Sequence, residues 1–164
     1  MRYYQRTGVG PGLTPESQKG IVMFNRTGST ISPGAVLQVD IYKTDADSTT
    51  MTPGAAGSAY RNLITPVTLV PLRTAEFMCY EGPGTLANDA EGKFTLVGLV
   101  DVDIVDGAVA LVDVLAIAAS TELAINPTLA GQKIVARAQA TRASGGALVP
   151  CFFNGYGFVQ DAIT

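Results

Sequence analysis

Residues 93–105 carry the clearest periodic pattern in the chain. One parity is apolar or glycine throughout, with Phe94, Leu96, Gly98, Val100, Val102 and Ile104. The other parity holds polar residues such as Thr95, Asp101 and Asp103. Successive side chains of a β-strand point to opposite faces, so a period of two predicts a strand with one buried face. This segment therefore favours a fold built from strands.

Other short apolar runs are separated by Gly, Pro, Asn and Asp, the residues that favour tight turns. We predict strands at residues 21–24, 35–42, 77–80, 132–140 and 147–153, and a last short run at residues 156–159. Within residues 63–72, Pro66 and Pro71 cannot donate a ladder hydrogen bond, so a strand there would lie at a sheet edge.

Three further segments set the connections. Asp106-Gly107, followed at once by an apolar run, predicts a two-residue hairpin turn. Residues 115–125 are rich in alanine and fit either a strand or a short helix, so both stay open. Residues 44–59 are small and polar without an apolar period, which predicts a long loop.

The predicted strands number about eight to ten, at the short spacing typical of an antiparallel β-barrel or sandwich rather than of βαβ units. Residues 1–20 combine Arg and Tyr with several Gly and Pro, and they predict an extended N-terminal arm. Residues 21–164 then form a single β domain, since the chain of 164 residues has the length of one domain. The predicted fold class is mainly β.

Histidine is absent from the sequence. This excludes Ser-His-Asp and Cys-His nucleophiles and every metal site that uses imidazole. The net charge of −3 disfavours nucleic acid as a partner. No apolar run is long and hydrophobic enough for a spanning helix, and the N-terminus lacks the apolar region of a signal peptide, so we expect no membrane partner.

Asp101, Asp103 and Asp106, followed by Gly107, have the residue types of a calcium loop. Their spacing departs from the EF-hand pattern, and Val112 stands where that pattern needs a glutamate. Exposed strand carboxylates and an Asp-Gly turn explain the same residues. We therefore predict no metal site, no cofactor and no catalytic residue.

The two cysteines, Cys79 and Cys151, lie too far apart in sequence to form a CxxC pair. Free cysteines are often small buried apolar residues, and a chain of this length can build a core without a disulfide. Whether the two meet in the fold stays open.

The N-terminal arm holds the candidate partner-binding residues, which are Arg2, Tyr3, Tyr4 and Arg6. Arginine and aromatic side chains are enriched where proteins bury contact surface on a partner. Only 15% of the chain is charged, against about 25% in a typical domain. This low charge favours a protein with part of its surface covered.

The order of these features resembles a known family. The runs that carry the likeness are 21–25, 27–36, 98–100, 108–115, 134–140 and 144–149, including the step Pro33-Gly34-Ala35-Val36. Together they resemble the strands and hairpins of bacteriophage capsid decoration (cement) proteins. The long loop at residues 44–59 and the arm at residues 1–20 are not part of the likeness.

The resemblance implies a non-enzymatic virion protein on the outer surface of an icosahedral phage head. It implies a symmetric oligomer, often a homotrimer, that bridges subunits of the major capsid protein and stabilises the expanded capsid. A carbohydrate- or surface-binding β module of the head-fibre or adhesion type is the alternative. A histidine-free enzyme that uses carboxylates comes third.

Overall fold

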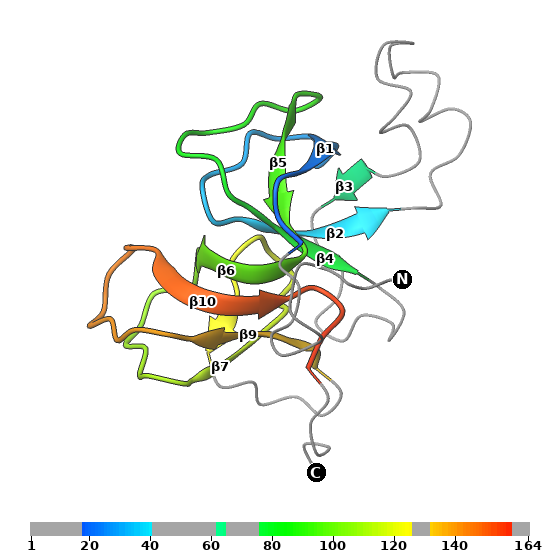
Figure 1. The fold of residues 1–164 in the computed structure, drawn as a ribbon. Helices are drawn as coiled ribbons and strands as arrows, with labels where there is room; N and C mark the ends of the chain where they lie inside the picture. Colours follow the sequence, from blue (N-terminus) through cyan, green and yellow to red (C-terminus); the bar gives the residue numbers. More distant parts are fainter. Residues whose placement is uncertain (1–17, 41–61, 65–75, 126–131, 159–164) are drawn as a thin grey trace, which may run out of the picture.

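The computed structural model describes residues 18–40, 62–64, 76–125 and 132–158, and in these residues the chain is all β, without a helix. The mainly β fold predicted from the sequence is confirmed. The strands form two sheets, drawn one above the other in Figure 1. They are β1 (Ile21–Asn25), β2 (Val36–Asp40), β3 (Asn62–Ile64), β4 (Phe77–Tyr80), β5 (Glu91–Thr95), β6 (Val97–Val102), β7 (Val114–Ala116), β8 (Ala124–Ile125), β9 (Ile134–Ala138) and β10 (Val149–Asn154).

The first sheet curls into a small barrel in the order β1-β3-β2-β4-β5. It closes because β1 pairs with β3 on one side and with β5 on the other. The β1–β3 pairing is parallel, and the other pairings of the barrel are antiparallel. Its interior is filled by large apolar side chains that include Leu37, Met78 and Phe94.

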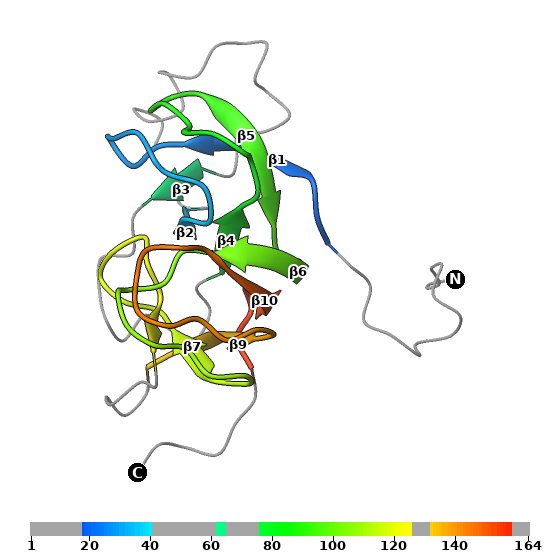
Figure 2. The same ribbon diagram turned by 90° about the vertical axis from the view of Figure 1, so that its left-hand side faces the viewer.

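The second sheet has the order β6-β10-β9-β7-β8, and its strands are all antiparallel. Neighbours in this sheet come from distant parts of the chain, since β6 pairs with β10 along its whole length. Figure 2 shows the barrel strands stacked over this sheet after a quarter turn of the view.

Strand β4 belongs to both hydrophobic cores, and all four of its residues are buried. Met78 and Tyr80 point into the barrel, whereas Phe77 and Cys79 point into the core of the second sheet. The face of β4 that points out of the barrel therefore packs into the core of the second sheet. This explains why residues 77–80 form a continuous apolar run instead of an alternating one.

Backbone hydrogen bonds join the two sheets at their contact. The N–H of Phe77 donates to the carbonyl of Gly155 at 3.0 Å, and the N–H of Gly155 donates to the carbonyl of Leu96 at 2.7 Å. A Cβ atom on Gly155 would lie 1.8 Å from the carbonyl oxygen of Phe77. Only glycine allows the two backbones to approach this closely.

The alternating pattern of residues 93–105 is present, but it is divided between the two sheets. Phe94 and Leu96 are buried in the barrel core, whereas Val100, Val102 and Ile104 are buried in the core of the second sheet. The division falls at Leu96, whose N–H donates to the carbonyl of Gln18 at 2.8 Å. A single amphipathic segment therefore continues from one sheet into the other.

The hairpin predicted at Asp106-Gly107 is wrong. Strand β6 before the turn and strand β7 after it are separated in the sheet by β10 and β9. The segment after β6 instead bridges to Leu123 through Ile104, and Val109 bridges to Arg142. Asp-Gly is a local turn signal, and contacts with residues far along the chain decide which strand pairs beyond the turn.

The strands predicted at residues 21–24, 35–42, 77–80, 132–140 and 147–153 are confirmed where the structure describes them. The sheet-edge position expected for a strand within residues 63–72 is wrong, because β3 lies between β1 and β2 in the barrel. Pro66 and Pro71, on which that expectation rested, lie outside the described residues.

Residues 115–125, left open between strand and helix, contain β7 and β8 and no helix. The last short run, at residues 156–159, forms a turn and an irregular segment up to Phe158 instead of a strand. The predicted loop at residues 44–59 and most of the predicted arm lie outside the described residues.

Candidate functional site

The outer face of the second sheet carries a row of apolar and aromatic side chains. In the strand register Phe152 of β10 lies directly opposite Leu99 of β6 on one side and Arg137 of β9 on the other. Directly opposed residues project from the same face of a sheet. Leu99 is 59% exposed, whereas Phe152 and Arg137 are partly buried.

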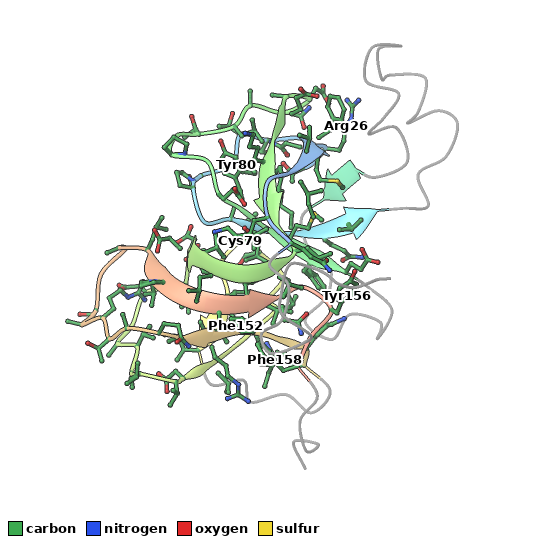
Figure 3. The ribbon with its side chains drawn as sticks, in the orientation of Figure 1. Arg26, Cys79, Tyr80, Phe152, Tyr156 and Phe158 are labelled. Carbon is green, nitrogen blue, oxygen red and sulfur yellow. The ribbon has the colours of Figure 1, made fainter. Side chains whose placement is uncertain are left out.

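Phe158 completes this row from the segment that follows β10. Its ring centroid lies 6.0 Å from that of Phe152, and the guanidinium of Arg137 lies 5.4 Å from the centre of the Phe158 ring. Figure 3 shows the two phenylalanines beside the second sheet. The N–H of Phe158 donates to the carbonyl of Ile134 at 2.9 Å, which ties the segment to β9. We call Leu99, Phe152, Arg137 and Phe158 the outer row.

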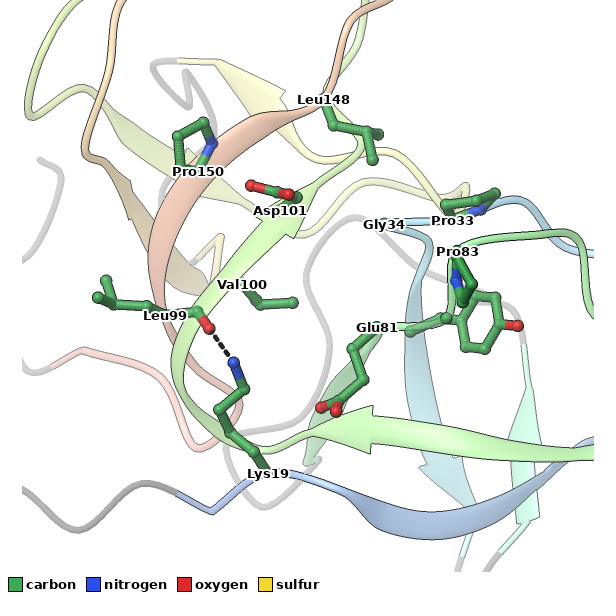
Figure 4. A pocket seen from close by; sticks show the side chains of 12 residues that line it. Lys19, Pro33, Gly34, Glu81, Pro83, Leu99, Val100, Asp101, Leu148 and Pro150 are labelled. Atoms are coloured by element: carbon green, nitrogen blue, oxygen red, sulfur yellow. Dashed lines mark hydrogen bonds between the residues drawn. The ribbon is translucent and has the colours of Figure 1, made fainter.

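Beside the outer row, a groove of about 600 Å³ separates β6 from the loop that follows β4. Its walls include Lys19, Glu81, Pro83, Leu99, Asp101 and Leu148 (Figure 4). Leu99 belongs to both features, so the outer row and the groove form one continuous surface. We call this depression the β6 groove.

Lys19 and Glu81 in the β6 groove are held by hydrogen bonds to neighbouring residues. The Lys19 ammonium donates to the carbonyl of Leu99 at 2.6 Å, the contact dashed in Figure 4. One carboxylate oxygen of Glu81 accepts from the Thr95 hydroxyl at 2.6 Å and from the Gly20 N–H at 3.2 Å. Glu81 is therefore a positioned acceptor in the groove wall.

The acidic residues singled out in the sequence do not converge. Asp101 is exposed beside the groove, and a carboxylate oxygen of Asp106 accepts from the Gly145 N–H at 2.7 Å. Burial raises the pKa of Asp103, and the nearby Glu122 carboxylate raises this pKa further. Across the part of the chain that the structure describes, no three acidic or cysteine side chains gather as a metal site would require.

Cys79 and Cys151 are free thiols buried in the core of the second sheet. Burial raises the pKa of the Cys151 thiol to about 12 and holds the pKa of the Cys79 thiol well above its usual value. The Cys79 Sγ lies 3.4 Å from the carbonyl oxygen of Gly34 and 3.6 Å from that of Asp101. Both cysteines act as small apolar residues that fill the core.

The predicted partner-binding residues Arg2, Tyr3, Tyr4 and Arg6 lie outside the described residues. The outer row was not among the candidate binding residues predicted from the sequence. Leu99 offered one signal, because it is an apolar residue on the polar parity of residues 93–105. Its neighbours in the row come from β9, β10 and the segment after β10, and only the strand register places them beside it.

The carbohydrate-binding alternative would be favoured by an exposed aromatic ring with polar groups converging on it. Tyr156 is 52% exposed, in the turn after β10. Its neighbour Asn154 uses its side-chain amide within the turn, accepting from the Tyr156 N–H at 3.1 Å and donating to the Gly157 carbonyl at 3.1 Å. Tyr156 therefore gives this alternative little support.

No protein-family model matches this chain, and no curated protein matches it either. Within the described residues, no helix has the length and hydropathy needed to cross a bilayer.

Proposed function

We propose that this protein is a non-enzymatic virion protein that decorates the outer surface of a phage head and stabilises the expanded capsid. It does so as a homotrimer whose subunits bridge neighbouring copies of the major capsid protein. The outer row supports this proposal, together with the resemblance to capsid decoration proteins.

The outer row has the composition of a protein contact surface. Aromatic residues and arginine are enriched in the energetically dominant parts of interfaces. Phe152, Arg137 and Phe158 provide these types on two neighbouring strands and the segment packed beside them. Leu99 of β6 extends the same face with an exposed aliphatic side chain. Because Leu99, Phe152 and Arg137 lie on paired strands, a partner would bind most of this face without ordering a loop.

Bridging accounts for stabilisation without any chemical step. A protein that binds only the expanded arrangement of capsid subunits shifts the equilibrium toward that arrangement by mass action. Several weak contacts on one oligomer act at a high effective concentration. Modest contacts on each subunit therefore suffice to hold the shell against the pressure of packaged DNA.

The proposal is tested by rebinding purified protein to expanded heads of the phage that encodes it. Virions are expected to contain the protein, and heads lacking it are expected to rebind it and withstand higher temperature. Leu99→Asp places a charge in the outer row and should weaken binding by tenfold or more. Val22→Asp is the matched control, because Val22 is an exposed aliphatic residue on a strand of the barrel.

Two results would count against this function. One is the absence of the protein from virions together with its failure to bind expanded heads. The other is equal binding by the Leu99→Asp and Val22→Asp variants, which would remove the outer row from the contact. In sedimentation, the proposed trimer should have three times the 17.0 kDa mass of the chain.

A further inference from the structure

The turn at residues 110–113 carries two adjacent apolar side chains that lie in solvent. Leu111 is 56% exposed and Val112 is 63% exposed. Together with Leu99, at 59%, they are the three most exposed large apolar side chains in the part of the chain that the structure describes. Two of these three stand side by side in sequence at one turn, which we call the apolar turn.

The backbone of Val112 is in an unfavourable conformation. The Asp113 N–H donates to the Ala110 carbonyl at 3.1 Å, which closes a β-turn with Leu111 and Val112 at its centre. The φ of Val112 is +64°, a left-handed value that suits glycine and strains a β-branched residue. Its side chain is mostly in solvent, so packing within the chain does not offset this strain. Strain of this kind is found where a residue serves a function.

The apolar turn is tied firmly to strand β9. The Val112 N–H donates to the Ala138 carbonyl at 2.9 Å, and the Ala138 N–H donates to the Asp113 carbonyl at 3.0 Å. A carboxylate oxygen of Asp113 accepts from the Ala110 N–H at 2.8 Å, so this charge is used within the turn. A partner would therefore bind the two apolar side chains without ordering the backbone.

The β6 groove is concave and has apolar walls that suit such a turn. Its apolar lining includes Pro33, Pro83, Leu99, Leu148 and Pro150 (Figure 4). The Lys19 ammonium and the Glu81 carboxylate already have hydrogen-bond partners within the chain. An apolar occupant therefore leaves neither of them unpaired. Asp101, the third charged residue of the lining, is exposed and can stay hydrated.

The apolar turn and the β6 groove lie on opposite sides of strands β10 and β9. The groove borders β6, whereas the turn is bonded to β9 on its β7 side. Neighbouring strands lie about 4.8 Å apart, so β6 and β7 are separated by about 14 Å. The turn, held at Ala138, cannot enter the groove of its own chain. A second copy of the chain can supply it.

We propose that the apolar turn of one copy binds in the β6 groove of the next copy. The contact joins two different surfaces, and such head-to-tail contacts close into a ring when the rotation between copies completes a circle. Rotation gives every outer row the same orientation to the ring axis, so one oligomer presents several contacts to a shell. As the contact that joins the homotrimer, it rests on the proposed function, but the association itself does not.

Disulfide cross-linking of the full chain tests which surfaces meet. Val112→Cys chains mixed with Leu148→Cys chains should form a linked dimer under mild oxidation, because the turn of one would lie on the groove wall of the other. Val22→Cys replaces Leu148→Cys in the control mixture, since Val22 is exposed and does not line the groove. The native thiols are buried and do not compete. Equal yields in the two mixtures, or Val112→Cys chains that link mainly to each other, would overturn the inference.

Sedimentation equilibrium measures the strength of the contact. The unmodified chain should be heavier than the 17.0 kDa monomer, and Val112→Gly should weaken its self-association about tenfold or more. Val22→Gly is the matched control and should leave association unchanged. At dilutions where the unmodified chain is monomeric, Val112→Gly should not lower the melting temperature, because glycine adopts this φ freely.

A monomer at every soluble concentration, or association that ignores Val112→Gly, overturns the inference. These measurements use no phage heads, so a failure of head binding leaves the inference intact. Conversely, a chain that binds heads through Leu99 while its association ignores Val112→Gly overturns this contact and leaves the binding role of the outer row standing.

Discussion

Arg142 and Gly107 are joined by two hydrogen bonds, in which Nε and Nη2 of the guanidinium donate to the same carbonyl oxygen at 3.2 and 2.8 Å. The same side chain also donates to the carbonyls of Ile104, Val105 and Ala147. One arginine thus holds the segment after β6 against the connection between β9 and β10. This contact takes the place of the hairpin that Asp106-Gly107 predicted.

Replacing Arg142 should destabilise the fold. Arg142→Ala leaves several carbonyl groups without their donor and should lower the free energy of unfolding by about 2–4 kcal/mol in urea denaturation. Arg142→Lys should recover little of this loss, because an ammonium cannot reproduce the planar fork of donors. Gln139→Ala serves as the control, since Gln139 is exposed and its side-chain amide donates to the nearby carbonyls of Arg137 and Ala138. An equal loss in both alanine variants would contradict this role.

Gly155→Ala should separate the two sheets at their contact. The added Cβ would lie 1.8 Å from the carbonyl oxygen of Phe77, and the clash is with backbone that cannot rotate away. We expect a loss of at least about 3 kcal/mol in the free energy of unfolding. Gly146→Ala, at a glycine with open space around it, should change stability little. Similar melting temperatures for the two variants would show that the contact can relax.

The buried thiols predict a loss of stability at alkaline pH. The pKa of Cys151 is raised by burial from 9.0 to about 12, so the folded chain keeps this proton after the unfolded chain has lost it. The stabilisation is complete below pH 9 and falls above it, by about 1.4 kcal/mol per pH unit for each such thiol. Urea denaturation between pH 8 and 11 measures this slope. The range starts below the ordinary thiol pKa of 9.0 and extends toward the folded-state pKa of Cys151, which is about 12.

Cys151→Ala is the control for the alkaline slope. It should make the fall in stability less steep, although it also lowers stability at every pH by removing a buried side chain. In the unmodified protein, both thiols should react with a thiol reagent only on unfolding. Rapid reaction of either thiol in the folded protein, or an unchanged slope in the variant, would contradict the burial.

The raised pKa of Asp103 predicts how the stability of the fold changes with pH on the acidic side. Its pKa is raised by burial and by Glu122, so ionisation costs the folded state more than the unfolded state. Stability from this group is full below its ordinary pKa of 3.8 and is lost as pH rises through the higher folded value. Asp103→Asn should therefore stabilise the protein at pH 7, by less than about 1 kcal/mol because the group is only partly buried.

The measurement for Asp103 is urea denaturation at pH 4 and pH 7. The gain in the Asp103→Asn variant should be larger at pH 7 than at pH 4, where the native carboxyl is more often protonated. Asp101→Asn, at an exposed position on β6, provides the comparison. A gain of the same size at both pH values would mean that ionisation of Asp103 is not its cause.

The sequence predicted most strands correctly because each strand has its own local period. The parity of residues 93–105 identified Phe94, Val100 and Ile104 as buried, and all three are. It did not predict the division at Leu96, because that break results from backbone contacts with Gln18 and Gly155. Those partners lie far from Leu96 along the chain, and no local pattern indicates them.

The same limit applies to the candidate site. The sequence drew attention to arginine and tyrosine in the arm, because those residue types stand together there. In the outer row the same kinds of side chain come from separate strands. Phe152 and Leu99 are neighbours only through the register of β10 against β6.

The amino-acid sequence alone determined the mainly β class, the places where strands begin and turn, and the absence of imidazole chemistry. These depend on side-chain period, turn residues and composition, which are properties of short segments or of the whole chain. Tertiary structure decided which strands pair, how β4 serves two cores, and which side chains meet on the outer face. Those outcomes depend on hydrogen bonds and packing between residues distant in sequence, and such contacts form only when the whole chain folds.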